Sequence, residues 1–433
     1  MKTRKTLDVP SDDNEDVLSC KYVKLLRRYL WLLRLWPGEE FGEKVPFLIK
    51  VHGNYVQFQI VLVLVAQLIY IHKYYDTMNF FLKGYTYLLF LLSIVTFFRL
   101  FVTTLKSYGT IVKTLFNTLH LANRKLDEKF EKQVYIYVEK ISYISTLTLI
   151  IMSYIGVSFF NIAPLYLNYK NGYFSGQQKE NSTYNCIVCI TIPKLTDSHD
   201  FSFFSTIFTM YITYPCTISV CGIDILLILM AFQIIGNMLV LRNRLETLSA
   251  KKEAITNDII IDETQEDEQS SFVLFNEEEN KLIHVKLVDC IKHHTTIIMF
   301  AEMMSSLFGP VLGLNYAFHL AACCLLLLEC AGGTDAIFRF GPLTVIIFSQ
   351  LILLSVVFEI VATVSEKLKN SVYFMPWERM DSRNRRTVYI MLARAQTPIR
   401  VNALGLANVG VTTMAQILKM TASYYALLNS ISK

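Results

Sequence analysis

Charged residues are scarce in this chain, at 18% of its 433 residues, whereas hydrophobic residues make up 53%. The net charge of +5 is too small to indicate a nucleic-acid partner. The sequence contains no phosphate-binding loop, metal-ligand motif or hydrolase signature, so we expect no enzyme activity, no metal and no cofactor. The polar residues 1–16 lack the apolar core of a secretory signal peptide, and insertion is expected to begin at the first apolar span.

The hydrophobic residues that are present come in long blocks. A helix needs about 20 mostly uncharged residues to cross the hydrocarbon core of a membrane. The blocks therefore predict an all-α membrane protein with seven spans, at 51–71, 84–105, 141–169, 201–241, 295–328, 340–364 and 401–431. No internal repeat of the kind found in many transporters accompanies them.

The distribution of basic residues predicts the topology. With a cytoplasmic N-terminus, most Lys and Arg residues fall on cytoplasmic segments. The outer segments then hold only Lys73, Lys83, Lys170, Lys179, Lys194, Arg339 and Lys433. The 201–241 block is long for one crossing, but a turn inside it would destroy this asymmetry. We therefore predict one long helix that projects into the cytosol.

Several loop segments add to this description. Asn181 begins the single N-glycosylation sequon, which lies in a loop predicted to face outward. Cys186 and Cys189 lie in the same loop, and a disulfide between them is one of two open alternatives. The acidic segment 257–279 is either a solvated linker or a cation reservoir near a pore exit. Segment 22–36 suits either a helix at the inner membrane surface or one packed on the bundle.

Motifs in the C-terminal third point to a family. They are residues 292–294 (KHH), 307–310 (LFGP), 389–398 (YIMLARAQTP) and 416–424 (QILKMTASY). Together they resemble insect odorant receptors over about 285–430. The final residues 425–433 (YALLNSISK) do not match the tail of the odorant-receptor co-receptor, so the resemblance is to a tuning subunit.

The resemblance implies an odour-gated, non-selective cation channel in the plasma membrane of olfactory sensory neuron dendrites. It implies a heterotetramer with the odorant-receptor co-receptor, a small volatile odorant as ligand, and lipid around the bundle. Two alternatives are a G-protein-coupled-type chemoreceptor and a gustatory-receptor-like channel. The first requires an outer N-terminus and an Asp-Arg-Tyr motif after span three, and neither fits this sequence.

The expected organisation follows the spans. It comprises a cytoplasmic N-terminal segment with an amphipathic helix (1–45), helices one to four with an outer-half odorant pocket (46–241), a cytoplasmic loop with the acidic linker (242–294), helices five and six (295–364), a cytoplasmic anchor region (365–403) and a pore-lining seventh helix (404–433).

The last span carries a mixed polar and apolar face. Its members recur at three and four residues and are Thr413, Gln416, Met420, Ser423, Leu427 and Ser430. In lipid such a face must meet protein or water. The pattern suits a pore lining or a packing face between helices, and the resemblance favours the pore, with Leu427 as the gate and Ser430 just outside it.

The odorant pocket is expected among aromatic and sulfur-bearing residues in the outer halves of the spans, because a volatile ligand binds mainly through apolar burial. The candidates are Tyr85, Tyr87, Leu88, Thr148, Ile151, Met152, Phe208, Tyr211, Phe338 and Phe340. The pair His293-His294 invites a metal interpretation, but adjacent side chains diverge on a helix, so we expect a structural role in the anchor region.

Overall fold

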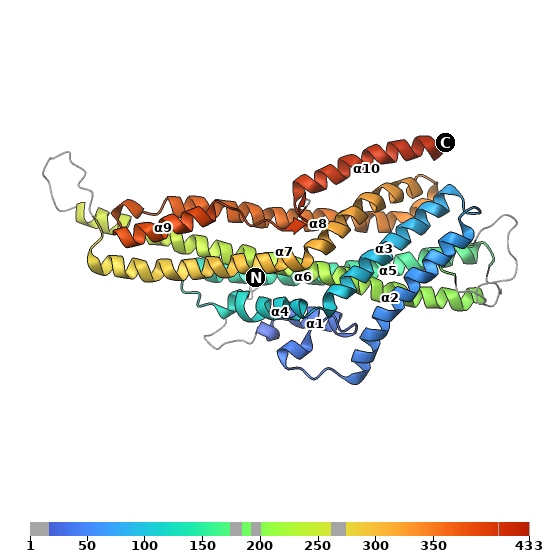
Figure 1. Cartoon of the computed structure of the whole chain (residues 1–433), viewed down its shortest axis with the longest axis horizontal. Coiled ribbons are helices and arrows are strands. Elements are labelled where there is room, and N and C mark those ends of the chain that lie inside the picture. The colour runs from blue at the N-terminus through green and yellow to red at the C-terminus, as the bar shows by residue number, and fades with distance from the viewer. Residues whose placement is uncertain (1–16, 174–183, 192–200, 261–273, 406, 433) are drawn as a thin grey trace, which may run out of the picture.

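The computed structural model describes residues 17–173, 184–191, 201–260, 274–405 and 407–432. The long helices run side by side along the long axis of the molecule (Figure 1). The long helices are α2 (Phe47–Tyr74), α3 (Phe80–Thr104), α5 (Lys129–Lys170), α6 (Phe201–Ile260), α7 (Glu277–Cys330), α8 (Thr334–Tyr373) and α10 (Val411–Ser432). Within the described residues, the first six of them are long and apolar enough to cross a membrane. The predicted all-α fold with seven long helices is confirmed.

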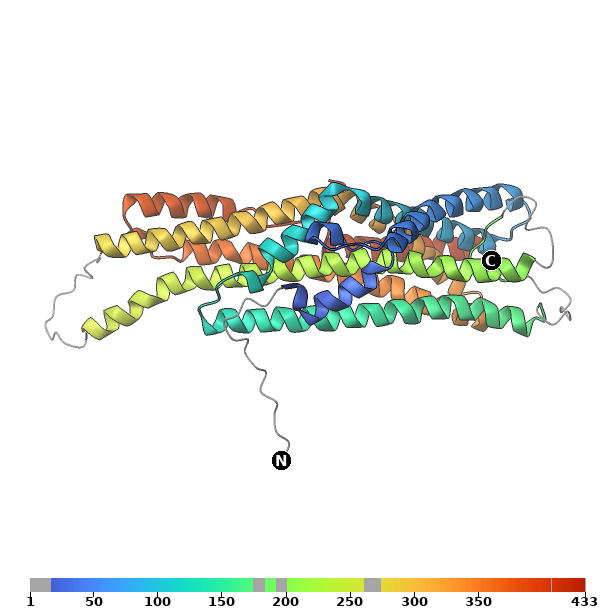
Figure 2. The same ribbon diagram turned by 90° about the horizontal axis from the view of Figure 1, so that it is seen from below.

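Helix α6 has 60 residues and is the longest of the described elements. At 1.5 Å per residue it is about 90 Å long, roughly three times the hydrocarbon thickness of a bilayer. Figure 2 shows it running along most of the molecule, and Pro215 lies inside the helix. The prediction of one long helix without an internal turn is therefore confirmed, and its projection into the cytosol stays a prediction.

Shorter elements gather around this bundle. They are η1 (Val17–Ser19), α1 (Lys21–Trp31), η2 (Gly38–Phe41), α4 (Lys106–Thr114), the π-turn η3 (Leu115–Leu119), η4 (Leu121–Asn123), η5 (Trp377–Arg379) and α9 (Ser382–Ala395). We call the end that carries α9 the inner end and the end that carries residues 184–191 the outer end. The largest hydrophobic core joins α1, α4, α6, α7 and α8, and smaller clusters lie toward the outer end.

Helix α1 packs into the bundle. Val23 and Leu26 are fully buried, and the Tyr22 hydroxyl lies 2.5 Å from His120 Nε2. The Ala122 N–H donates to His120 Nδ1 (3.1 Å), so the neutral ring carries its proton on Nε2, and burial lowers the pKa of His120 to about 4. Of the two alternatives for segment 22–36, the structure favours the packed helix.

The last helix begins later than expected. Strands β1 (Asn402–Ala403) and β2 (Ala407–Asn408) pair in antiparallel register, Asn402 with Asn408 and Ala403 with Ala407. Leu404 and Gly405 lie at positive φ angles of 55° and 71°, which a right-handed helix cannot contain. The predicted start of the span at 401 is therefore wrong, and α10 begins at Val411.

Candidate functional site

A cavity of about 120 Å³ lies in the outer half of the bundle. Its wall is formed by α2, α3, α5, α6 and α8, together with Val188 from the outer loop. Aliphatic side chains are the largest group in the lining, with Phe160 as its aromatic member. A mostly apolar cavity of this kind binds small molecules through burial and shape.

Most of the hydroxyl groups on the wall bond to their own helix. Ser93 donates to the carbonyl of Leu89 (3.0 Å), and Thr96 donates to that of Leu92 (2.8 Å). Such a hydrogen bond to the preceding turn satisfies the hydroxyl group within its own helix and leaves the apolar atoms of the side chain pointing away from that helix. The wall is therefore less polar than its residue types suggest.

A buried ion pair forms the inner floor of this region. Arg99 of α3 lies 2.8 Å from the Asp224 carboxylate of α6, and its side chain is 1% exposed. Its second amino group donates to Asn315 Oδ1 of α7 (2.9 Å). Gln350 of α8, which lines the cavity, donates to the same Asp224 carboxylate. Four helices are thus tied together beneath the cavity.

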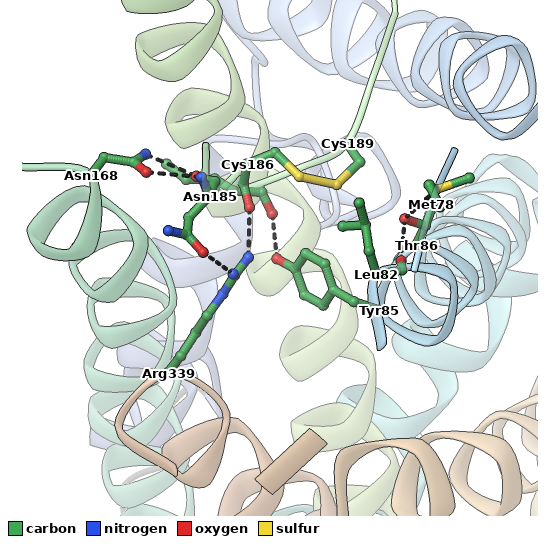
Figure 3. The surroundings of a disulfide bond; sticks show 10 residues. Met78, Leu82, Tyr85, Thr86, Asn168, Asn185, Cys186, Cys189 and Arg339 are labelled. Carbon is green, nitrogen blue, oxygen red and sulfur yellow. Dashed lines mark hydrogen bonds between the residues drawn. A yellow bond between two sulfur atoms is a disulfide. The ribbon is translucent and has the colours of Figure 1, made fainter. Parts of the chain in front are cut away.

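The outer roof is formed by residues 184–191, which fold back between the helices (Figure 3). A disulfide joins Cys186 and Cys189. Arg339 donates to the carbonyl of Cys186 (2.9 Å), and Tyr85 donates to that of Ile187 (2.7 Å). These bonds hold Val188 over the cavity, where it is part of the lining.

The ten residues expected to bind ligand fall into three groups. Met152 lines the cavity and is also partly exposed at the surface of the bundle, at 39%. Tyr85, Leu88 and Phe340 are buried in the cluster beneath the roof, with the Tyr85 and Phe340 rings 5.3 Å apart. The exposed members are Tyr87, Thr148, Ile151, Phe208, Tyr211 and Phe338. As ligand contacts all ten stay predictions, and the structure adds Gln67, Thr213 and Gln350 as polar lining residues that the sequence reasoning missed.

Helix α10 diverges from the rest of the bundle toward the outer end (Figure 1). Ile417 and Thr421 are buried against neighbouring helices. The opposite face carries the predicted pore residues, which are exposed except for the partly exposed Thr413: Thr413, Gln416, Met420, Ser423, Leu427 and Ser430. In this single chain the face therefore meets no covering helix among the described residues.

Other predicted features lie away from the cavity. His293 is buried, and its Nε2 lies 2.9 Å from Asn237 Oδ1, which fits a structural role. Asn181 and residues 261–273 of the acidic segment lie outside the described residues. Within the described part of the chain, no group of three or more His, Cys, Asp or Glu side chains is arranged to hold a metal ion.

A bundle of seven long helices, six of them apolar enough to cross a membrane, together with an apolar cavity in its outer half indicates a polytopic membrane protein. The model of the seven-transmembrane odorant receptor family matches residues 77–422. The chain therefore belongs to this family.

Two relatives from Drosophila melanogaster illustrate the similarity in sequence. Odorant receptor 85b is 25% identical over 146 residues, and Odorant receptor 85c is 24% identical over 146 residues. Each alignment covers 33% of this chain, and they cover 37% and 38% of the relatives. The match thus spans little more than a third of the length of these curated relatives.

The fold is similar to that of the insect olfactory receptor OR5 from Machilis hrabei. The structure of OR5 in complex with eugenol superposes with a TM-score of 0.73 at 14% identity, over 96% of this chain and 100% of that chain. A second OR5 structure gives a TM-score of 0.72 at 13% identity, over 94% of this chain and 98% of that chain. At such low identity the likeness establishes the fold.

Proposed function

We propose that this chain is an odorant receptor: a subunit of an odour-gated, non-selective cation channel that binds a small volatile organic molecule. The observation that carries the proposal is the apolar cavity of about 120 Å³ in the outer half of the bundle. An apolar cavity of about 150 Å³ in another protein holds a benzene molecule. The space therefore suits a compact, mostly hydrocarbon ligand.

Family membership and fold support the same function. The family is that of odorant receptors, and OR5, which shares the fold, has been captured with eugenol. Neither a G-protein-coupled-type chemoreceptor nor a gustatory-receptor-like channel gains support from these comparisons.

The free face of α10 supports a role in ion conduction. Gln416, Ser423 and Ser430 offer amide and hydroxyl groups that can replace part of a cation's hydration shell, and Leu427 adds an apolar side chain near the outer end. Polar groups facing lipid are unfavourable, so this face requires water or another subunit. A pore shared between subunits meets that requirement.

We further propose that the partner subunit is the odorant-receptor co-receptor, in a heterotetramer in the plasma membrane of olfactory sensory neuron dendrites. The similarity to Odorant receptor 85b and Odorant receptor 85c favours the role of the tuning subunit. The ligand then binds in this chain, and its binding energy shifts the shared pore toward the open state.

Co-expression in a host cell tests the proposal. We expect odour-evoked cation current from this chain together with the co-receptor, when a broad panel of volatile compounds is applied, and little current from this chain alone. Cells with the co-receptor alone are the matched control. Large responses without any partner, or no response to the panel with it, would contradict the proposed assembly or function.

A further inference from the structure

One polar side chain on the cavity wall differs from the others. Gln67 lies in the outer part of α2 and lines the cavity, and it is 1% exposed. Neither its Nε2 nor its Oε1 has a hydrogen-bond partner among the described residues. A carboxamide offers both donors and an acceptor, and all of them are buried here.

The other polar groups of the wall have partners within the protein. Ser153 donates to the carbonyl of Ile150 (2.8 Å), and Thr217 donates to that of Thr213 (2.9 Å). Thr213 pairs with Asn161, and Gln350 donates to Asp224. Gln67 is therefore the lining side chain whose whole polar end lies buried without a partner in the described part of the chain.

A buried amide without a partner is unfavourable, because it gives up its hydrogen bonds to water. A ligand in the cavity that carries a hydrogen-bonding atom would restore such a bond. A pure hydrocarbon would leave the amide unpaired, so the site would discriminate against it. Charged ligands are also disfavoured. Arg99 and Asp224 beneath the cavity neutralise each other, so neither is available as a counter-ion for a ligand.

We propose that Gln67 is the specificity-determining residue of the cavity and binds the single oxygen function of its ligand. This inference rests on the proposed function, in which the cavity is the odorant site. The ligand class is then a small hydrocarbon with one hydroxyl or carbonyl oxygen. A hydroxyl can donate to Oε1 or accept from Nε2, and a carbonyl oxygen accepts from Nε2.

The test compares ligands that differ only in the oxygen function. Primary alcohols, straight-chain ketones and alkanes of equal chain length, from pentane to octane, are applied to the channel formed with the co-receptor. For the unsubstituted chain we expect the oxygenated member of a pair to act at concentrations about tenfold lower than the alkane, the size of effect that one hydrogen bond produces. Equal potency within the pairs overturns the inference without any variant.

The variant Gln67→Leu removes the amide at nearly constant volume. We expect it to raise the half-maximal concentration of the alcohol or ketone about tenfold and to leave the alkane response equal or stronger. Gln67→Met serves the same purpose if the first variant does not reach the cell surface, which surface labelling establishes.

Gln59→Leu is the matched control. Gln59 lies earlier on the same helix and is 4% exposed, and its amide atoms also lack a partner among the described residues. It lines a small neighbouring void and not the cavity. The control should therefore keep the preference for oxygenated ligands.

The outcomes separate the two proposals. Absence of any odour response in the unsubstituted channel counts against the proposed function. If the unsubstituted channel responds normally and Gln67→Leu keeps the preference for oxygenated ligands, the inference is overturned and the proposed function stands. Equal weakening of both members of each pair also overturns it, because it assigns Gln67 a structural role.

Discussion

At the scale of single residues, the buried pair Arg99–Asp224 is the most consequential feature. Both side chains lie in the membrane-crossing part of the bundle. The Arg99 guanidinium nitrogen lies 2.8 Å from the Asp224 carboxylate oxygen, and the two side chains are 1% and 6% exposed. Charges in such surroundings persist only when they are paired and hydrogen-bonded. Asn315 and Gln350 supply further hydrogen bonds from two other helices. Removal of one partner leaves the other charge buried and unpaired.

We expect Asp224→Ala to destabilise the folded protein by about 3–5 kcal/mol, the range for breaking a buried ion pair. The double variant Arg99→Met with Asp224→Ala should recover part of this loss, because no unpaired charge remains. Thermal unfolding of the detergent-solubilised protein measures both effects.

The exposed pair Arg394–Glu302 provides the comparison. Its side chains are 57% and 66% exposed, and the atoms are 3.0 Å apart. Surface pairs contribute about 0–1 kcal/mol, so Glu302→Ala should change stability little. If Asp224→Ala were no more damaging than Glu302→Ala, the buried pair would not hold these helices together.

At the scale of elements, the β1–β2 hairpin connects α9 and α10 and is fastened to α7. The Leu404 N–H donates to the carbonyl of Gly309 (3.2 Å). A Cβ atom at Gly309 would lie 2.6 Å from the backbone oxygen of Asn402, too close for any real contact. At the start of α10, the Val411 N–H donates to Glu359 of α8 (3.0 Å). We therefore expect movement of α7 or α8 to be passed to the first turn of α10.

The variant Gly309→Ala should push the hairpin away from α7 and weaken this connection. We expect a several-fold loss of ligand-evoked current at near-normal surface abundance, because the added methyl meets backbone and not a flexible side chain. Whole-cell current normalised to surface labelling measures it. Gly341→Ala in α8 is the control, since a Cβ there lies 3.7 Å from its nearest neighbour, an ordinary contact. Equal currents from the two variants would show that the hairpin does not transmit ligand binding.

The elements also show what the sequence can and cannot predict. The number of long helices and the single helix through Pro215 followed from apolar blocks and basic residues, which are local or additive signals. The hairpin before α10 was missed, because its strands have two residues each and Leu404 gives no signal for a positive φ. The aromatic stripes predicted the outer half as the ligand region. The cavity lining depends on how helices rotate against one another, which periodicity alone does not fix.

At the scale of the whole molecule, the exposed face of α10 is the feature that supports the proposed assembly. A single helix cannot enclose a pore, and the face that carries Leu427 has no covering helix among the described residues. In the proposed heterotetramer, this face and the corresponding faces of the partner subunits around a central axis would give a water-filled path, and Leu427 would contribute to its apolar ring. Such a ring can stop ion flow by excluding water from the narrow part of the pore, even where the side chains do not fill it. The gate is then a property of the complex and absent from the isolated chain.

This arrangement makes a specific prediction for Leu427→Ala. Shortening the side chain widens the ring and lowers the cost of wetting it, so we expect a higher resting current and smaller relative activation by ligand. Leu418→Ala is the matched control, because it lies nine residues earlier, about half a turn round the helix, and packs partly against the core. The measurement is resting and ligand-evoked current in channels formed with the co-receptor. An unchanged resting current in Leu427→Ala, or an equal rise in Leu418→Ala, would remove Leu427 from the gate and leave the face of α10 as a surface for packing between subunits.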